Sequence, residues 1–225
     1  FISDINNELI NFYKIVKNKP KALIKQIEQF KLDYRKNPKE VYYKLRNIQI
    51  TEEFNNYDQV WKAARTLFLN KTCFNGMYRV NKKGYFNTPW NRSEKLPCFY
   101  QDDNLYKISK ILKKSKIKVS NYWNIISFIK KNDFVYIDPP YDQLNKNTFT
   151  SYAPTNFDKF DQIKLANFCS EINKKGAYFL LSNHNTKFIR ELYKNFNITI
   201  IHAKRMINSN GNGRGEIEEV LITNY

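Results

Sequence analysis

The chain has 225 residues, 42% of them hydrophobic, which suits one core or one core with an inserted lobe, and no apolar run is long enough to span a membrane. Lys and Arg number 38 against 21 acidic residues, and this net charge of +17 favours a polyanionic partner such as nucleic acid, although a Lys/Asn/Ile-rich genome is an alternative cause. Three scattered cysteines disfavour a disulfide framework and indicate a reducing compartment.

The first half of the chain has the pattern of a helical body. Asn6 is expected to cap a helix with an apolar stripe over residues 9–16. Pro20 interrupts that stripe and predicts the start of a second helix. Residues 39–47 and 58–70 predict two further helices.

The pattern of residue types changes at Met77. Residues 77–87 read as strand, glycine turn and strand, which predicts a hairpin carrying Arg79, Lys82 and Lys83. A proline-containing loop follows, and residues 105–114 are helical again.

From Ile117 onward, short apolar runs alternate with helical stretches. The runs are IKVS, FVYI, AYFLLS and ITIIHA, separated in part by helices predicted at residues 160–174 and 186–195. This alternation predicts a largely parallel sheet covered by helices. The final run, EVLITNY, follows a glycine-rich turn and is expected to add an antiparallel edge strand.

These elements predict an α/β fold with two domains. FISDIN at the start reads as a strand end leading into a helix, so residues 1–19 are expected to join residues 105–225 in one domain. Residues 20–104 then form an inserted helical lobe that bears the hairpin.

Two carboxylates stand where predicted strands end, the place where open α/β sheets bind ligands. Asp4 could accept hydrogen bonds from ribose hydroxyls, or it could simply cap the following helix. Asp138 could be a turn residue. Alternatively, Pro139 and Pro140 lack N–H groups and leave acceptors beside the ring of Tyr141, a pocket suited to a planar amine that donates two hydrogen bonds.

DPPY at residues 138–141 resembles the motif of the Dam/DpnM family of DNA adenine-N6 methyltransferases. The resemblance covers essentially the whole chain. It extends to SDINNELINFYKIVKNKP after Ile2, to residues 74–92 as a target-recognition hairpin, to FTSY at 149–152, to LSNH at 181–184, and to Arg205 with the segment that follows. LSNH could instead be a strand end with a helix-capping asparagine.

The resemblance implies a Rossmann-like methyltransferase sheet, mixed but mostly parallel, and transfer of a methyl group from S-adenosylmethionine to adenine N6. Asp138 and the carbonyl of Pro139 would accept the amino hydrogens, and the target base would be flipped out and stacked on Tyr141, with Pro140 completing the turn. Asp4, Asn121, Tyr122 and Asp138 match cofactor-binding positions. No metal is expected, since His184 and His202 lack ligand companions.

The resemblance also implies contacts with double-stranded DNA, and the matched target would be GATC. Arg79 would read a guanine and Met77 a thymine methyl. Taken singly, each arginine could equally be a solvated surface charge. The matched DNA-binding positions are Phe74, Asn75, Met77, Arg79, Arg92, Arg205, Asn210 and Arg214.

The family's FxGxG loop after its first strand has no counterpart here, because all glycines lie at Gly76 or later. The sequence is therefore expected to be a fragment or a natural truncation, and to bind the cofactor weakly or not at all by itself. Two other functions stay open: a catalytically inactive DNA-binding remnant, and an amino-methyltransferase acting on RNA or a protein amide.

The resemblance carries expectations about context as well. It implies a monomer in the bacterial cytoplasm, associated with the nucleoid through DNA and with no membrane partner. A cognate restriction endonuclease is a possible companion.

Overall fold

The computed structural model describes residues 1–144, 157–204 and 216–225. The chain divides into two compact units, Phe1–Tyr122 and Trp123–Tyr225. The predicted sites at FTSY, Arg205, Asn210 and Arg214 lie outside the described residues.

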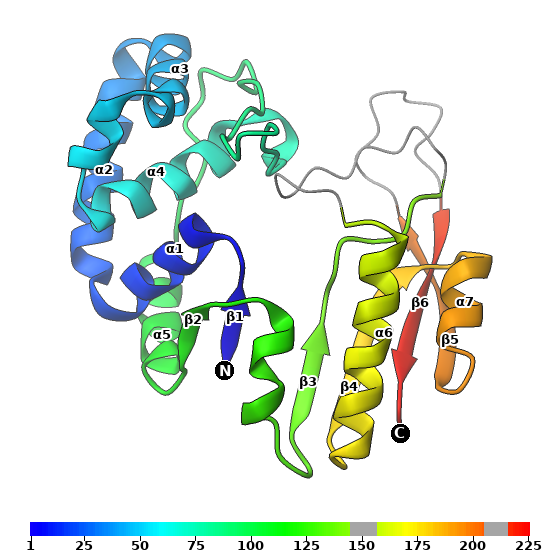
Figure 1. The fold of residues 1–225 in the computed structure, drawn as a ribbon. Coiled ribbons are helices and arrows are strands. Elements are labelled where there is room, and N and C mark those ends of the chain that lie inside the picture. The colour runs from blue at the N-terminus through cyan, green and yellow to red at the C-terminus, as the bar shows by residue number, and fades with distance from the viewer. Residues whose placement is uncertain (145–156, 205–215) are drawn as a thin grey trace. The chain divides into compact units, whose positions relative to one another are not determined.

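The first unit is a helical body with a short parallel pair of strands (Figure 1). Its elements are β1 (Ile2–Asp4), α1 (Asn7–Asn18), α2 (Pro20–Lys36), α3 (Pro38–Asn47), η1 (Ile48–Ile50), η2 (Glu52–Asn56), α4 (Gln59–Thr72), η3 (Phe74–Gly76), α5 (Asp102–Lys113) and β2 (Ile117–Val119).

Local capping explains where these helices begin. The side chain of Asn6 accepts hydrogen bonds from the backbone N–H groups of Glu8 and Leu9, so the predicted cap of α1 is confirmed. Pro20 occupies the first turn of α2, where a missing N–H costs nothing. Asp58 caps α4 by accepting from Trp61.

One hydrophobic core runs through the first unit. Ile10 of α1 and Phe68 of α4 belong to it and are fully buried. The ring of Phe68 stacks on Phe99, with 5.0 Å between the ring centroids. Residues 1–19 thus share a core with helices that the sequence assigns to the inserted lobe, and the boundary between the units lies after Tyr122. The division into a catalytic domain and an inserted recognition domain stays a prediction.

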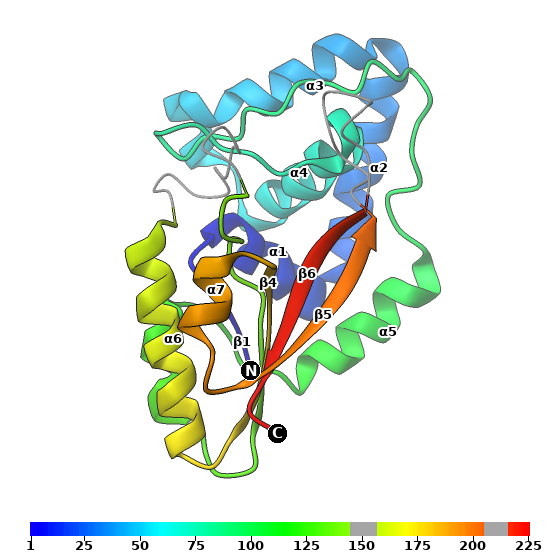
Figure 2. The same cartoon turned by 90° about the vertical axis from the view of Figure 1, so that its right-hand side faces the viewer.

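The second unit is a four-stranded mixed sheet in the order β3-β4-β6-β5. α6 and α7 lie on the same face of this sheet (Figures 1 and 2). β3 is parallel to β4, whereas β6 is antiparallel to both of its neighbours. The elements are η4 (Tyr122–Phe128), which crosses the unit boundary, β3 (Phe134–Ile137), α6 (Lys159–Lys174), β4 (Tyr178–His184), α7 (Lys187–Leu192), β5 (Asn197–Lys204) and β6 (Glu216–Thr223).

The predicted place of the last strand is wrong. β6 is antiparallel, as expected, but it lies between β4 and β5 instead of at the edge. Burial agrees with this order. Val220 and Ile222 of β6 are fully buried, as suits an interior strand, whereas Ile200 of β5, the edge strand, is 49% exposed.

Residues 77–87 form a less regular structure than the expected pair of strands. A single antiparallel bridge joins Val80 to Phe86. Backbone hydrogen bonds from Asn81 N to Tyr85 O (2.9 Å) and from Asn87 N to Arg79 O (2.9 Å) flank this bridge. The chain turns back on itself here, but the described residues of this segment contain no regular strand.

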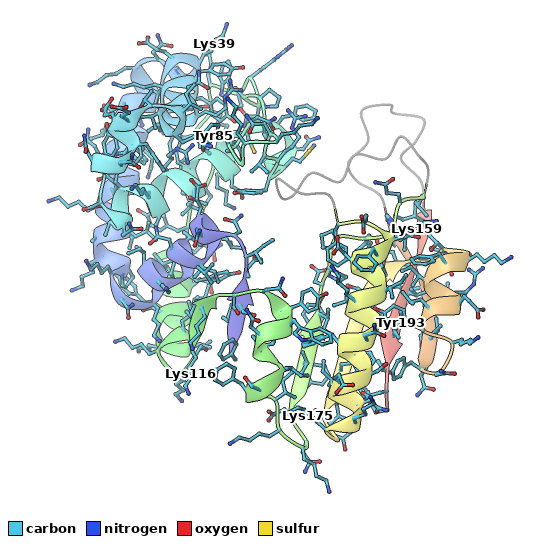
Figure 3. All side chains as sticks on the ribbon, in the orientation of Figure 1. Lys39, Tyr85, Lys116, Lys159, Lys175 and Tyr193 are labelled. Atoms are coloured by element: carbon cyan, nitrogen blue, oxygen red, sulfur yellow. The ribbon has the colours of Figure 1, made fainter. Side chains whose placement is uncertain are left out.

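Lysine side chains lie on the outside of each unit, for example Lys39 and Lys116 in the first and Lys159 and Lys175 in the second (Figure 3). Within the described ranges, no helix is both long and apolar enough to cross a membrane.

The three cysteines differ in burial, and their reactivity should follow. Cys98 is exposed, whereas burial raises the pKa of Cys73 to about 11 and that of Cys169 to about 12. We expect an alkylating reagent near neutral pH to modify only Cys98 in the folded protein, as counted by mass spectrometry. Denatured protein, the control, should react at all three. Rapid modification of Cys169 in the folded protein would contradict the buried position.

Candidate active site and DNA-binding segment

Asp138 directly follows β3 and is solvent-exposed. The parallel register pairs Ile137 with Leu181 of β4, which places Asp138 beside Ser182. The hydroxyl of Ser182 donates a hydrogen bond to Oδ1 of Asp138 at 3.1 Å. A carboxylate is thereby held at the carboxyl end of a parallel strand, where α/β sheets bind their ligands.

Tyr141 lies beside this carboxylate. Its ring packs edge-on against His184, with 5.0 Å between the centroids and 87° between the planes. Burial raises the pKa of Tyr141 above its usual value, while Ser182 lowers it and Glu219 and Asp138 raise it further, and the hydroxyl is protonated at neutral pH.

Two buried amide side chains hold the turn between Asp138 and Tyr141. Gln162 of α6 donates from Nε2 to the carbonyl of Pro140 at 2.9 Å. Asn183 donates from Nδ2 to Oε1 of Gln162 at 3.2 Å and accepts from the backbone N–H of Asp142 at 2.8 Å. Gln162 and Asn183 are 1% and 0% exposed. The backbone of the DPPY turn is therefore bonded to both α6 and β4.

One interpretation of LSNH was that its asparagine, Asn183, caps the following helix. The structure shows that Thr186 caps α7, so this interpretation is wrong. The sequence did not indicate the role of Gln162 in holding this turn, because a glutamine near the start of a helix is expected to be a surface residue.

Asp4 lies at the end of β1, which pairs in parallel with β2 and matches Asp4 to Val119. The backbone N–H of Ser120 donates to the carbonyl of Asp4 at 3.0 Å. Asn121 and Tyr122 follow at once, so three of the cofactor positions that the resemblance implies lie near one edge of this strand pair. The alternative that Asp4 caps α1 is wrong, since Asn6 does so.

The side chains at this edge have the chemistry to bind a nucleoside. The backbone N–H of Asn6 donates to Oδ1 of Asp4 at 2.7 Å, which leaves Oδ2 of this half-buried carboxylate for the hydroxyls of a ribose. The amide of Asn121 and the ring of Tyr122 suit a planar base. Among the described residues, no cluster of three or more His, Cys, Asp or Glu side chains could hold a metal ion.

The predicted DNA-binding residues Phe74 and Asn75 lie on the short turn η3. Phe74 is 45% exposed, and its backbone N–H donates to the carbonyl of Pro89 at 2.8 Å. Asn75 has φ +53°, a conformation that asparagine tolerates better than most residues. The turn thus presents an aromatic ring and an amide at the surface.

Arg79 and Met77 lie on the strand-like segment that follows. The guanidinium of Arg79 donates from Nε to Oδ1 of Asn87 at 2.8 Å and from Nη2 to the carbonyl of Asn87 at 3.0 Å. Thr88 donates from Oγ1 to the carbonyl of Met77 at 2.7 Å. Arg92 is exposed and has φ +61°. Arg79 is therefore held across the turn by two hydrogen bonds.

Buried tyrosines anchor this segment to the helices. Tyr42 donates its hydroxyl to the carbonyl of Thr88 at 2.8 Å, and Tyr34 donates to the carbonyl of Ser93 at 2.6 Å. Trp90 donates in turn to the hydroxyl of Tyr34 at 2.8 Å. Burial raises the pKa of both tyrosines, which keeps them protonated as donors. The sequence does not indicate these anchors, because the acceptors lie 46 and 59 positions from Tyr42 and Tyr34 along the chain.

Tyr78 stands between Met77 and Arg79, and its ring packs against Phe86, with 5.5 Å between the ring centroids. Burial and Glu8 raise the pKa of Tyr78, while Asn6, two residues after Asp4, lowers it. The tyrosine that separates two predicted DNA-binding residues is therefore electrostatically coupled to the turn after Asp4.

Comparison with known proteins places these features in a family. The family model of the D12 class of N6 adenine-specific DNA methyltransferases matches residues 1–207. Type II methyltransferase M.MjaIII of Methanocaldococcus jannaschii is 44% identical over 100% of this chain and 79% of its own length. Type II methyltransferase M1.LlaDCHI of Lactococcus lactis is 36% identical (100% and 78%), and the DNA adenine methylase of Vibrio cholerae is 34% identical (98% and 78%). The chain belongs to the D12 class of N6 adenine-specific DNA methyltransferases.

Proposed function

We propose that the protein transfers a methyl group from S-adenosylmethionine to N6 of a flipped adenine within GATC. The observation that carries this proposal is the exposed carboxylate of Asp138 at the end of β3, oriented by Ser182 and flanked by Tyr141. A carboxylate, a backbone carbonyl and an aromatic ring match the two donors and the flat face of an adenine amine.

The chemistry required of these residues is orientation. The lone pair of the adenine amino nitrogen is delocalised into the ring, so the amine is a poor nucleophile. Asp138 and the carbonyl of Pro139 accept its two hydrogens, which localises the lone pair and aims it outward. The carbonyl of Pro140 already accepts from Gln162, which supports assigning the second contact to Pro139. Tyr141 stacks on the flipped base.

S-adenosylmethionine, when bound, supplies the electrophilic methyl group. Asp4 is assigned to its ribose hydroxyls, and Asn121 and Tyr122 are assigned to its adenine. Asp138 is also assigned to its methionine end. These assignments follow the resemblance, and the open Oδ2 of Asp4 supports the ribose contact.

DNA recognition is assigned to the first unit. Arg79 contacts a guanine in the major groove, Met77 a thymine methyl, and Arg92 a phosphate. Phe74 and Asn75 contact DNA beside the flipped base, which the exposure of Phe74 supports. Arg205, Asn210 and Arg214 are assigned to backbone contacts by the resemblance alone.

Methylation of defined duplexes tests the function. Labelled S-adenosylmethionine and a duplex with one GATC site should give labelled N6-methyladenine, and a duplex in which the target adenine is replaced should give none. Equal labelling of adenines outside GATC would refute the specificity. No labelling, with a known adenine methylase active in the same mixture, would refute the catalytic function and favour a DNA-binding remnant.

Replacing Arg79 by alanine should weaken discrimination at one base pair. A bidentate arginine–guanine contact contributes about 1–3 kcal/mol, so the preference for guanine at that position should fall roughly 5- to 160-fold. Competition between GATC duplexes and duplexes altered at the guanine measures this preference. Lys83→Ala, on the same turn, is the control and should change only the salt dependence of binding. Unchanged discrimination in Arg79→Ala would assign the readout elsewhere.

The proposed setting is a monomer in the cytoplasm, associated with the nucleoid through DNA. Two of the relatives compared carry the name type II methyltransferase, which supports a cognate restriction endonuclease as a companion.

A further inference from the structure

We infer that Ser182 is a positioning residue, whose single hydroxyl orients the catalytic carboxylate of Asp138. This inference rests on the proposed function and deepens it. Ser182 belongs to the LSNH stretch, for which the resemblance assigned no individual role.

The backbone of Ser182 is fixed on both sides. It lies in β4, an interior strand that pairs with β3 on one side and β6 on the other. It stands opposite Leu221 in the antiparallel ladder. Its side chain is 5% exposed, so water does not compete for the hydroxyl. Both its position and its surroundings are therefore rigid.

A serine hydroxyl has one hydrogen to donate, and Ser182 donates it to Oδ1 of Asp138, at 3.1 Å. Hydrogen bonds to charged groups are roughly twice as strong as neutral ones, so this contact restrains the rotation of the carboxylate.

Because Oδ1 of Asp138 accepts from Ser182, Oδ2 is the oxygen left to accept from the adenine amine. The ring of Tyr141 is restrained separately, by its edge-on contact with His184. One buried hydroxyl thereby sets the direction in which the catalytic acceptor points.

Loss of this hydroxyl should affect the chemical step more than binding. Asp138 would rotate about its side-chain bonds, and a misplacement of about 1 Å costs about 100-fold in rate. We expect kcat to fall roughly 10- to 100-fold and KM for DNA to change less than about twofold, since Ser182 contacts neither DNA nor cofactor in this scheme.

The matched variants are Ser182→Thr and Ser182→Val, which have nearly the same shape and differ in one hydroxyl. Both are β-branched residues that suit a strand interior. Ser182→Thr is expected to keep at least about a third of wild-type kcat, and Ser182→Val to show the 10- to 100-fold loss. The threonine variant thus corrects for any disturbance caused by the larger side chain. Ser170→Ala, which removes a hydroxyl bonded within α6 to the carbonyl of Ala166, should leave kcat unchanged.

Steady-state kinetics on a GATC duplex test this role of Ser182, and thermal melts check that each variant is folded. Wild-type turnover on that duplex establishes the proposed function in the same assay, and its absence would overturn the proposed function together with the inference. With active wild-type protein, equal kcat for the threonine and valine variants would overturn the role of Ser182 alone. So would a loss that falls entirely in KM.

Discussion

Asp138→Ala is expected to lower kcat for adenine methylation by about 10²–10³-fold, the usual loss when one preorganised polar partner of a transition state is removed. Affinity for DNA should change less than about threefold, because the flipped base is the only part of the DNA that the carboxylate contacts. The physical reason is the loss of the acceptor that localises the amine's lone pair. Single-turnover methylation measures the first quantity and fluorescence anisotropy the second.

Asp138→Asn is the matched control for size. The asparagine amide can place an NH₂ group where the carboxylate oxygen stood, and this group donates where adenine needs an acceptor. Its kcat should therefore also fall, although Ser182 can still donate to the remaining amide oxygen. Equal loss of methylation and DNA binding in both variants would assign Asp138 a structural role.

Arg65→Met is expected to destabilise the first unit by about 2–5 kcal/mol, because two backbone carbonyls lose their donor and each unsatisfied buried acceptor costs about 1–3 kcal/mol. Arg65 is 0% exposed and donates from Nε to the carbonyl of Leu45 at 2.6 Å. It also donates from Nη1 to Glu8 at 3.1 Å and from Nη2 to the carbonyl of Arg46 at 3.1 Å. Burial lowers the pKa of Arg65, while Glu8 opposes this change. One side chain thus joins α4 to α1 and α3.

Urea unfolding followed by tryptophan fluorescence measures this effect, because Trp61 and Trp90 both lie in the first unit. The exposed Arg35→Met is the control and should shift the free energy of unfolding by less than about 0.5 kcal/mol. A loss below about 1 kcal/mol in Arg65→Met would show that the buried network contributes little, as some buried ion pairs do.

Local features of the sequence determined most helix boundaries and the candidate carboxylates. Asn6, Pro20 and Asp58 begin helices through their own side-chain or ring geometry, which requires no distant residue. Likewise, the two prolines after Asp138 predict an acceptor-rich turn from the chemistry of proline alone. Such features can be predicted from a single sequence because their causes lie within a few residues.

The tertiary structure alone decided which residues support those features. Ser182 lies 44 positions from the Asp138 it orients, and Gln162 lies 22 positions from the Pro140 carbonyl. In the sequence, Arg65 is one basic residue among many, and only the structure shows its partners on other helices. β6 lies between β4 and β5, where Val220 and Ile222 on one face of the strand are fully buried, and such burial is more favourable than exposure at an edge. Pairing between distant segments depends on the free energy of the whole core, and a local pattern contains only a small part of it.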